Sequence, residues 1–472
     1  MSPFYNVGRW DKYADRTVLF AETVQAMRDA VGPDFAFGVR FSTHEFGMED
    51  LGYPGQTIEE TQTLFIPIAE KIGIDWIHAS VGRIGVTPDH SFPPVYAPHG
   101  VNVKYAEACK EVAHIPVIAV GRLMDPKLIE KIVEDGQADM VALCRPIIAD
   151  QHFVKKMIEG RHDDIRKCLG CNWCLHCLFV QYDVECTMNP SYGREKQYVV
   201  TPAPETKKVM VVGGGPSGLQ VALTASQRGH EVTLYEKSDK LGGQVNLASA
   251  FPHLYTRDLK NLPDWLAREL EQTTTVKVVL NTEVTPELVK KEKPDAIVVA
   301  TGAKEKVAEL PAGAENVAYL WDYLRGTAKI GNNVVVLGGN EGAEAALSLA
   351  REGKEVTLVE ESADIALASY IFMFSCRREP LFRWMKEDKV TILAEHKVKA
   401  ATGDTLTLAD NWGVEKKVAY DTIVVAVGRE PVNELYQAIA KRGSEVYLLG
   451  DAKEPRNMKD DNREAFWVGR HI

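Results

Sequence analysis

Five of the eight cysteines of this 472-residue chain lie in one short segment, which points to metal chemistry. Three of them recur at every third residue, and another returns after eleven further residues. Soft thiolate ligands select iron–sulfur clusters or zinc. Structural zinc usually uses two CxxC pairs, so this pattern favours a [4Fe-4S] cluster, with zinc as the alternative. The predicted ligands are Cys168, Cys171, Cys174 and Cys186.

The remaining clustered cysteine, Cys177, leaves the ligand set open. With the first three it completes a ferredoxin-like run, in which it would replace Cys186, although the proline that usually follows such a run is missing. Disulfides are a poor explanation, because the sequence shows no export signal and the cytosol keeps thiols reduced. We therefore expect metal-bound thiolates.

The most specific pattern in the chain is a glycine-rich loop between an apolar run and a helical stretch. Gly213, Gly215 and Gly218 follow the apolar run, and Glu236 ends the next apolar run. Glycines at this spacing let the backbone turn tightly, approach a pyrophosphate and present helix N-terminal amides to it. The acid, about 20 residues on, is placed to bind a ribose hydroxyl. The order of these elements predicts a dinucleotide site.

A second, weaker pattern of the same kind begins near residue 333. If Gly339 and Gly342 are its second and third glycines, the first position is Leu337 and the fingerprint is incomplete. Glu360, at the end of the next apolar run, favours the unphosphorylated ribose of NADH over NADPH. A degenerate fingerprint can also persist as scaffold alone, so both interpretations stay open.

The elements around these residues predict an α/β protein. Residues 1–160 contain four apolar runs, each preceded by an amphipathic helical stretch, which indicates a parallel sheet with right-handed crossovers. A TIM (β/α)8 barrel needs eight such units, so this segment is predicted to be its C-terminal half, with function at the C-terminal ends of the strands. Residues 161–205 hold the cysteines and a linker, and 206–325, 326–420 and 421–472 form two nested Rossmann-like domains.

Composition excludes several classes of protein. A net charge of −11 and an isoelectric point near 5.7 argue against a nucleic-acid binder, which needs clustered Lys and Arg. No stretch approaches the roughly 18 to 20 apolar residues of a membrane-spanning helix. We expect a cytoplasmic protein that binds neither nucleic acid nor membrane and acts on a small molecule.

Further motifs make residues 207–472 resemble the pyridine nucleotide-disulfide reductase-like fold, which binds two dinucleotides. The resemblance places FAD in 206–325 and 421–472, and a nicotinamide dinucleotide in 326–420. In that fold the final Gly-Asp lets the acid reach the ribityl chain of the flavin, a role that falls here to Asp451. The motif residues are Gly242, Gly243, Thr301, Gly302, Gly450 and Asp451.

The whole chain resembles the Old Yellow Enzyme-related iron–sulfur flavoenzymes, which include 2,4-dienoyl-CoA reductase and trimethylamine dehydrogenase. The strings ADMVALCRPIIADQHF, EGRHDDIRKCLGCNWC and CTMNP carry this resemblance. The short spacing from Cys171 to Cys174 is most similar to the amine dehydrogenase branch, whereas LGGQVNLASAFP is more similar to the FAD-containing reductases. The resemblance therefore implies FMN, a [4Fe-4S] cluster and either FAD or ADP.

The same resemblance assigns an FMN site to residues 1–160. Arg40 would lie against the electron-rich N1/O2 edge of FMN, with a barrel salt bridge as the alternative role. Gly121 with Arg122, and Cys144 with Arg145, would hold the FMN phosphate. Position 144 is often glycine in relatives, so close approach is less certain there. His90 and His99 lie in a Pro-rich loop after a barrel strand, where relatives place substrate contacts. His90 is the candidate proton carrier, and a solvated loop histidine is the alternative for each.

The first residues resemble the family stretch that follows the fourth barrel strand, with Asn6, Arg9, Asp11 and Tyr13 recognisable. The first four strands are therefore expected to be absent from this sequence. A half barrel would expose parallel-strand edges, so we expect a fragment of a longer gene. A partner chain or a second copy that completes the barrel is the alternative.

These observations predict an oxidoreductase that passes electrons between NADH, FAD, the cluster and FMN, and reduces an activated carbon–carbon double bond. One alternative is an amine dehydrogenase that donates to an electron-transferring flavoprotein, with ADP in the dinucleotide site. Another is a non-catalytic electron-transfer subunit whose partner supplies the catalytic barrel.

Overall fold

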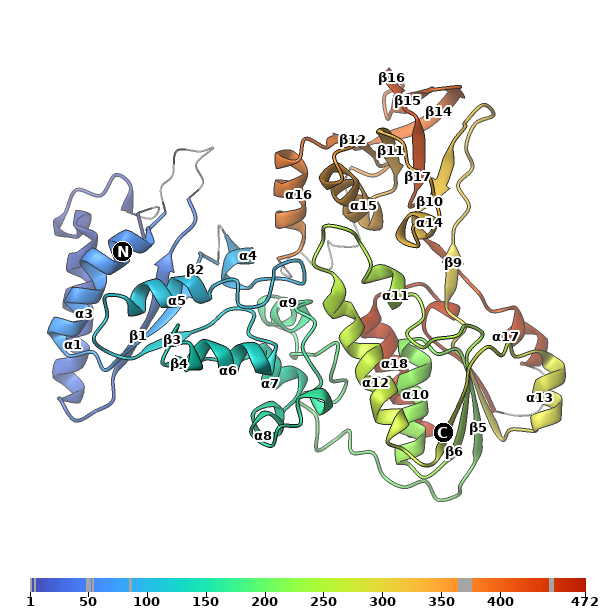
Figure 1. Cartoon of the computed structure of the whole chain (residues 1–472), viewed down its shortest axis with the longest axis horizontal. Helices are drawn as coiled ribbons and strands as arrows, with labels where there is room; N and C mark the ends of the chain where they lie inside the picture. The colour runs from blue at the N-terminus through green and yellow to red at the C-terminus, as the bar shows by residue number, and fades with distance from the viewer. Residues whose placement is uncertain are drawn as a thin grey trace. The chain divides into compact units, whose positions relative to one another are not determined.

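The computed structural model describes residues 2–3, 6–47, 52, 55–84, 87–363, 376–440 and 445–472. The chain divides into two compact units, Met1–Ile147 and Ile148–Ile472. Figure 1 follows both units from the blue N-terminal strands to the red helix α18. Each unit is α/β. No helix in the described ranges combines the length and the apolar character needed to cross a membrane.

The first unit is built on one parallel sheet in which the strands lie in chain order, β1-β2-β3-β4. The four apolar runs predicted as strands form these four strands. The strands are β1 Gly38–His44, β2 Trp76–Val81, β3 Val117–Ala119 and β4 Met140–Val141. The helical segments are η2 Lys12–Ala14, α1 Arg16–Val31, α2 Ile58–Glu60, η4 Thr61–Phe65, α3 Ile66–Ile72, α4 Pro88–Ser91, α5 Val103–Lys110, α6 Pro126–Glu134 and α7 Arg145–Ala149.

Local sequence explains where the helices of this unit begin. The side chain of Asp15 caps α1, and Thr57 and Glu60 form a reciprocal capping box at α2. Asp125 caps α6, whose first residue is a proline with no amide to satisfy. The helices cover the face of the sheet that carries Phe41, which packs against Phe20 at 6.0 Å between ring centroids. The opposite face of the sheet carries the residues that alternate with Phe41 along β1, including Arg40 and Ser42.

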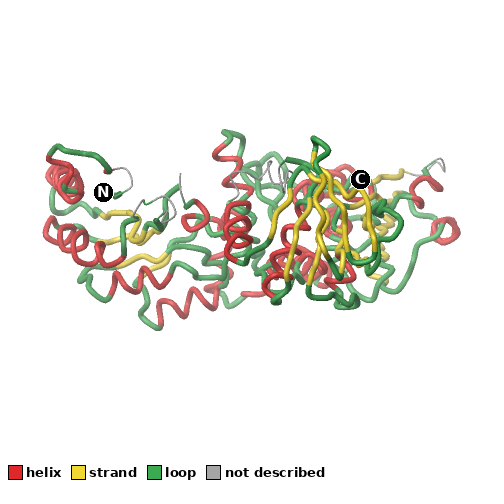
Figure 2. Tube along the Cα trace, turned by 90° about the horizontal axis from the view of Figure 1, so that it is seen from above, coloured by secondary structure: helices red, strands yellow, loops and turns green. Residues whose placement is uncertain are grey.

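The second unit contains two five-stranded parallel sheets of the same design. The first has the order β19-β8-β5-β6-β7 and the second β10-β17-β11-β12-β13, so β5 and β11 hold equivalent central places. In Figure 2 the strands of this unit run side by side in yellow. The first-sheet strands are β5 Lys208–Val212, β6 Glu231–Tyr235, β7 Val276–Val279, β8 Ala296–Val299 and β19 Glu445–Leu448. Those of the second are β10 Val317–Tyr319, β11 Asn333–Leu337, β12 Glu355–Val359, β13 Thr391–Leu393 and β17 Thr422–Val425.

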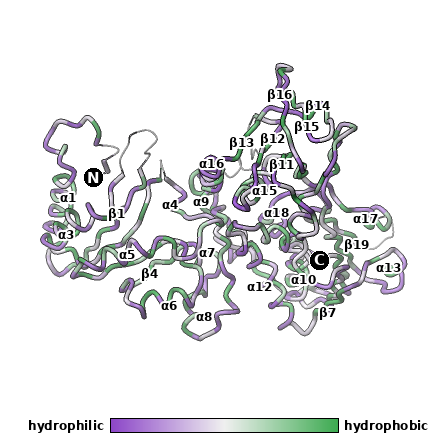
Figure 3. Tube along the Cα trace, turned by 45° about the horizontal axis from the view of Figure 1, so that its top comes forward, coloured by the Kyte–Doolittle hydropathy of each residue, from purple (hydrophilic) through white to green (hydrophobic). Residues whose placement is uncertain are grey.

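Helices pack on both sheets of this unit, and α10, α12 and α18 lie side by side (Figure 1). Helix α10 is almost entirely buried, whereas α13 presents mainly hydrophilic residues (Figure 3). The helices are α8 Phe153–Ile158, η5 His162–Asp164, α9 Trp173–Phe179, α10 Pro216–Gln227, α11 Val245–Ala248, η6 Arg257–Lys260, α12 Asn261–Glu271, α13 Pro286–Glu292, α14 Leu320–Leu324, α15 Asn340–Arg351, α16 Arg378–Glu387, α17 Glu434–Ile439, η8 Gly450–Ala452 and α18 Met458–His471. Two small antiparallel sheets complete the unit, β9 Ala303–Glu305 with β18 Arg429–Pro431, and β14 His396–Thr402 with β15 Thr405–Asp410 and β16 Glu415–Ala419.

Candidate functional site

The loop from β5 to α10 is folded so tightly that two of its positions accept only glycine. Gly213 has φ +111°, and a Cβ there would lie 2.2 Å from the carbonyl oxygen of Ala300. A Cβ on Gly218 would lie 1.9 Å from the carbonyl oxygen of Gly213. Above Gly215 the nearest atom to an added Cβ is 3.9 Å away, on Gly243. The loop thus leaves open space beside the amides at the start of α10, as a bound pyrophosphate requires.

The acid at the end of β6 is held against this loop. One carboxylate oxygen of Glu236 accepts the N–H of Gly214 at 2.7 Å, and the other accepts the N–H of Ser238 at 2.8 Å. A second glycine turn closes over it, because the N–H of Gly242 donates to the Gly214 carbonyl at 2.8 Å. Gly242 and Gly243 have φ +109° and +55°. The side chain and loop predicted to share a dinucleotide therefore lie together.

The remaining predicted residues of this domain reach the same helix end. A Cβ on Gly450 would lie 2.4 Å from Oγ of Ser217, in the first turn of α10. The neighbouring Asp451 carboxylate pairs with Arg429 and accepts the N–H of Arg456 at 2.9 Å. Gly302 has φ +75°. The hydroxyl of Thr301 donates to the carbonyl of Val432, which ties the loop after β8 to the residue that follows β18.

A carboxyl group that the sequence analysis missed lies beside Asp451. Asp461, on α18, is 9% exposed, and the Cβ position of Gly450 is 3.6 Å from its Cγ. Burial, with the Asp451 carboxylate close by, raises the pKa of Asp461 to about 8, although Arg456 and Arg429 act in the opposite direction. No motif marks this residue, so only the fold could reveal it.

The second dinucleotide-type loop corrects the expected register. Gly338 has φ +118°, a Cβ there would lie 2.1 Å from the carbonyl of Ala426, and its N–H donates to the end of β12 at 3.0 Å. Gly213 makes the same set of contacts in the first loop. The expectation that Leu337 holds the first position is therefore wrong, because Leu337 is the last residue of β11. The second and third positions belong to Asn340 and Ala343.

The other predicted residues of this loop fall elsewhere in it. Gly339 precedes α15 as its N-cap, and Gly342 lies in the first turn, where an added Cβ would be in ordinary contact with Leu358 at 3.5 Å. Glu360 accepts the N–H of Ser362 at 2.9 Å, as Glu236 does from Ser238. The loop glycine of the first module is replaced by Asn340, whose side chain is exposed.

One acid, Glu341, lies in the first turn of α15, and a second, Glu344, follows that turn. Glu341 lies 3.5 Å from Arg429, and burial raises the pKa of its carboxyl. Glu344 pairs with Arg377 at 3.3 Å. The Asn340 side chain takes the place of the second fingerprint glycine, so this loop matches the dinucleotide pattern less well than the first one does.

Three of the predicted cluster ligands, Cys168, Cys171 and Cys186, contact or lie near other groups of the cysteine segment. Sγ of Cys168 accepts the N–H of Gly170 at 3.4 Å, and Sγ of Cys171 is 3.3 Å from Oγ1 of Thr187. Burial, together with the nearby Cys168 and Cys171 thiols, raises the pKa of Cys186 to about 12. Such a thiol becomes a thiolate only with a metal or cation to stabilise it, and soft iron suits this donor set.

The two other clustered cysteines lie on α9. Cys174 is partly exposed, whereas Cys177 is 1% exposed and burial raises the pKa of its thiol. Across the ranges described above, no three His, Cys, Asp or Glu side chains converge as they would on a single metal ion.

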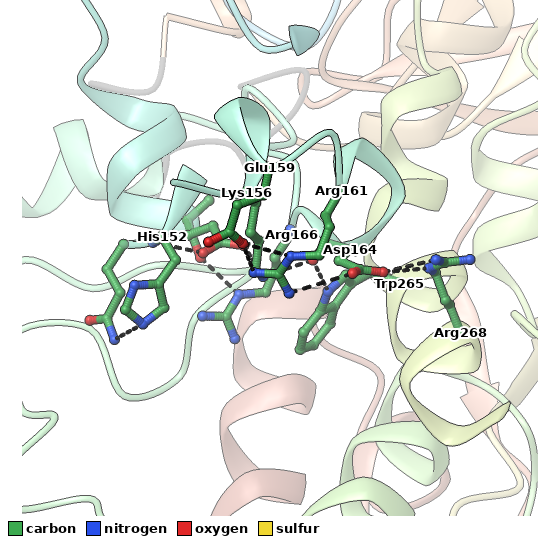
Figure 4. A network of polar contacts seen from close by, with 11 residues as sticks. His152, Lys156, Glu159, Arg161, Asp164, Arg166, Trp265 and Arg268 are labelled. Atoms are coloured by element: carbon green, nitrogen blue, oxygen red, sulfur yellow. Dashed lines mark hydrogen bonds and ion pairs between the residues drawn. The ribbon is translucent and has the colours of Figure 1, made fainter. Parts of the chain in front are cut away.

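The segment that leads to the cysteines is anchored to α12 by the network in Figure 4. Asp164 accepts Nη2 of Arg268 at 2.8 Å, and Nε1 of Trp265 donates to its backbone carbonyl at 3.2 Å. The Arg166 guanidinium lies 4.9 Å from the centre of the Trp265 ring. Asp150 accepts the Arg166 N–H at 3.0 Å and pairs with Lys156 at 2.7 Å. The cysteine segment is thereby fixed to the dinucleotide-binding part of its own unit.

In the first unit, the face of the sheet opposite Phe41 is polar. Arg40 pairs in register with His78 on β2, and its Nη2 lies 3.4 Å from Oγ of Ser80. Burial and the Arg40 charge lower the pKa of His78 to about 4. The Arg40 side chain is itself exposed. The Arg40 guanidinium therefore lies on this sheet face next to an uncharged His78 and Ser80.

The predicted phosphate loops follow β3 and β4. A Cβ on Gly121, which has φ +122°, would lie 2.6 Å from the Asn102 side chain. The buried Arg122 guanidinium donates to the carbonyls of Val95, at 3.0 Å, and Ala97. Its Nε and Nη2 thus contact the loop that follows β2, and its contact with a phosphate stays a prediction.

The neighbouring loop residues are placed as follows. Nη1 of Arg145 donates to the carbonyl of Pro93 at 2.8 Å, and Cys144 before it is exposed. The ring of His90 stacks on Phe46 at 3.5 Å and lies 3.8 Å from Asp89. Residues of the loops after β1 and β2 thus meet beyond the ends of these strands, whereas His99 lies further along the second loop.

Two family descriptions match the chain. Residues 8–164 match the NADH:flavin oxidoreductase / NADH oxidase family, and residues 207–453 match pyridine nucleotide-disulphide oxidoreductase. The two matches coincide with the barrel-type sheet of the first unit and the Rossmann-type sheets of the second.

Whole-length similarity extends across both units. The chain is 36% identical to an NADH oxidase from Thermoanaerobacter brockii over all of its own length and 72% of that protein. It is 31% identical to a cinnamate reductase from Clostridium sporogenes, over 99% of this chain and 71% of that one. The solved structure of a 2-naphthoyl-CoA reductase complex superposes with a TM-score of 0.86 at 29% identity, covering 98% of this chain and 70% of that chain.

Proposed function

Because this chain belongs to the NADH:flavin oxidoreductase / NADH oxidase family, we propose that it is an iron–sulfur flavoprotein that reduces an activated carbon–carbon double bond. The names of two similar proteins, cinnamate reductase and 2-naphthoyl-CoA reductase, support an unsaturated carboxylate or thioester as substrate. When bound, FAD and the cluster supply electrons one or two at a time, and FMN supplies hydride.

One observation carries this proposal: a dinucleotide loop and a cysteine cluster belong to the same folded unit and share the helix α18. Asn462 of that helix donates to the carbonyl of Thr187, within the cysteine segment, at 2.8 Å. Arg463 pairs with Glu185 in the same segment. A flavin site joined to a cluster in this way suits electron transfer rather than metal storage.

Residues of the second unit would bind FAD and the iron–sulfur cluster. The amides of Gly215 and Gly218 hold the FAD pyrophosphate, and Glu236 binds a ribose hydroxyl. Asp451 binds the ribityl chain, as in the related fold. The four iron ligands are Cys168, Cys171, Cys174 and Cys186, with Cys177 left as a buried thiol.

In the first unit, the four β/α units would be half of an FMN-binding TIM barrel, with the polar sheet face toward its interior. Arg40 supplies a positive charge to the flavin. Gly121 and Arg122 offer backbone amides to the phosphate, and the Arg122 guanidinium, held by two loop carbonyls, would face it with its remaining nitrogen. Arg145 borders the same loops. His90 is placed to move a proton to substrate.

We assign no step to a nicotinamide dinucleotide. Glu360 would favour NADH over NADPH, but Asn340 replaces the second glycine of the fingerprint.

The first test is flavin extraction with iron and sulfide assays on the chain expressed anaerobically. We expect FMN, FAD and about four irons per chain. FAD and iron without FMN would instead support an electron-transfer subunit.

The second test follows reduction of cinnamate by product chromatography, with NADH or reduced methyl viologen as donor. Phenylpropionate formed with either donor supports the reductase. Product with viologen alone would show that the second module does not deliver electrons. No product with either donor, together with flavin bleaching by dimethylamine, would overturn the reductase in favour of an amine dehydrogenase that donates to an electron-transferring flavoprotein.

A further inference from the structure

The turn that carries Cys186 also reaches a second cysteine. Thr187 directly follows Cys186 in the sequence, and its Oγ1 lies 3.3 Å from Sγ of Cys171. Thr187 is 4% exposed. One short turn therefore carries one of the proposed iron ligands and contacts another.

The direction of the Thr187 hydrogen bond follows from chemistry. A cysteine bound to iron is a thiolate with no proton, so only the hydroxyl can donate. Hydrogen bonds to anionic acceptors are stronger than neutral ones, and hydrogen bonds to cluster sulfurs tune reduction potential. Reduction adds negative charge to the sulfurs, so a donor at this position stabilises the reduced cluster more than the oxidised one.

Asn462 holds the threonine in place from α18. Its Nδ2 donates to the backbone carbonyl of Thr187 at 2.8 Å, and its side chain is fully buried. A β-branched side chain has few rotamers, so fixing the backbone of Thr187 also fixes the direction of its hydroxyl. Arg463, the next residue of α18, pairs with Glu185 on the other side of Cys186.

We propose that the hydroxyl of Thr187 donates to the Cys171 thiolate and raises the reduction potential of the cluster, with Asn462 as the positioning residue. This inference rests on the proposed cluster and adds to it a residue outside the ligand set. Through α18, the helix that also carries Asp461, the potential of the cluster becomes sensitive to the packing of the flavin domain.

The test is a dye-mediated redox titration of the full chain, followed by the electron paramagnetic resonance signal of the cluster. Thr187→Val keeps the shape of the side chain and removes the donor. We expect the ratio of reduced to oxidised cluster at a fixed potential to fall about tenfold, which is ~59 mV toward negative values for one electron. Thr187→Ser, which keeps the hydroxyl, is expected to restore most of the wild-type potential.

Two further variants separate tuning from general damage. Thr422→Val removes an equally buried threonine hydroxyl, which accepts the N–H of Gly331 at 2.9 Å far along the chain from any cysteine, and is expected to leave the potential unchanged. Asn462→Leu keeps the volume and loses one hydrogen bond, since Oδ1 has no partner in the described part of the chain. It is expected to shift the potential in the same direction as Thr187→Val, by less.

Each outcome decides the proposal. If Thr187→Val keeps its full iron content and the wild-type reduction potential, the proposal is overturned, whatever the catalytic activity of the variant. If that variant loses iron, Asn462→Leu with full iron and an unchanged potential would overturn it. A wild-type chain without iron and sulfide would overturn both this inference and the proposed cluster.

Discussion

The two βαβ modules of the second unit have the same backbone plan and different phosphate loops. In both, the strand-end glycine lies against a carbonyl of the neighbouring strand, that of Ala300 for Gly213 and that of Ala426 for Gly338. In both, the acid after the second strand accepts the N–H of a serine two residues on. The first loop then continues with glycines, and the second with Asn340, Glu341 and Glu344.

The difference separates what folding needs from what binding needs. The strand-end glycine is required by the backbone turn, so both modules keep it. The second and third glycines serve the ligand and the close packing of helix on loop. At Asn340 a side chain replaces the second glycine, whereas Ala343 satisfies the third position, which accepts glycine or alanine. Glu236 bonds the Gly214 amide, and within the described residues Glu360 makes no matching bond to its loop.

The largest predicted effect comes from Gly218→Ala in the first module. The new Cβ would lie 1.9 Å from a carbonyl oxygen, so the loop must move away from the helix. We expect FAD retained after gel filtration to fall to less than about a tenth of one equivalent, by the close-packing role of the third glycine. Ala343→Gly, the matched change in the second module, should leave FAD at wild-type levels. Equal retention by both variants would break the comparison.

The next effect is on stability and concerns Asp461, which borders the first module. Because its pKa is raised to about 8 in the folded chain and is ordinary when unfolded, the folded state binds more protons between about pH 4 and pH 8. Stability contributed by this group is therefore lost as pH rises through that range. We expect Asp461→Asn to raise the thermal midpoint at pH 8 relative to wild type by about 5 °C, on the order of 2 kcal/mol, and to have little effect near pH 4.

Thermal unfolding monitored by circular dichroism at several pH values measures this effect. Asp460→Asn, on the same helix turn, serves as control and should leave the pH dependence as in wild type. A difference between Asp461→Asn and wild type that is constant from pH 4 to pH 8 would contradict the assignment.

A smaller effect is expected for Glu236→Gln. The change keeps the shape but weakens the bond to the Gly214 amide and to a ribose hydroxyl. We expect FAD affinity to fall about tenfold, or ~1.4 kcal/mol. Glu360→Gln is the matched change, and titration calorimetry of FAD into the apoprotein should find it unaltered. Loss of FAD affinity in both variants would mean that the acids act on the fold rather than on the ligand.

The smallest predicted effect is on NADH binding and comes from making the second phosphate loop more like the first. Asn340→Gly returns the second glycine of the fingerprint to the second module. We expect NADH to bind about fivefold more tightly, or ~1 kcal/mol, while the acids of α15 continue to oppose it. Fluorescence titration of NADH measures the change. Weaker NADH binding than in wild type would show that Asn340 contacts the dinucleotide instead of blocking it.

Much of the second unit could be predicted from local pattern. The runs around Gly213 and Glu236 predict a strand, a loop and a helix in the order observed, because periodicity and glycine spacing are local properties. The register of the second loop could not be predicted with equal certainty. Adjacent glycines at 338 and 339 permit two alignments, and the choice depends on where β11 ends against β12 and β17.

The contacts around the cysteines show the other limit. The spacing of Cys168, Cys171 and Cys174 predicts a cluster, but nothing near Thr187 in the sequence points to Asn462, which is 275 residues away. Likewise, no motif pairs Asp451 with Asp461 or assigns the Arg122 guanidinium to the carbonyls of its neighbouring loop.

The sequence by itself determined the α/β class, the dinucleotide loop and the cysteine segment, because each depends on residue types at short, fixed spacings. The tertiary structure alone decided which glycine begins the second loop, which arginines pair with Glu341 and Glu344, and which side chains of α18 touch Gly450 and the cysteine segment. Those outcomes depend on packing between distant segments, where burial and the direction of each side chain set the hydrogen bonds, and spacing along the chain carries no record of them.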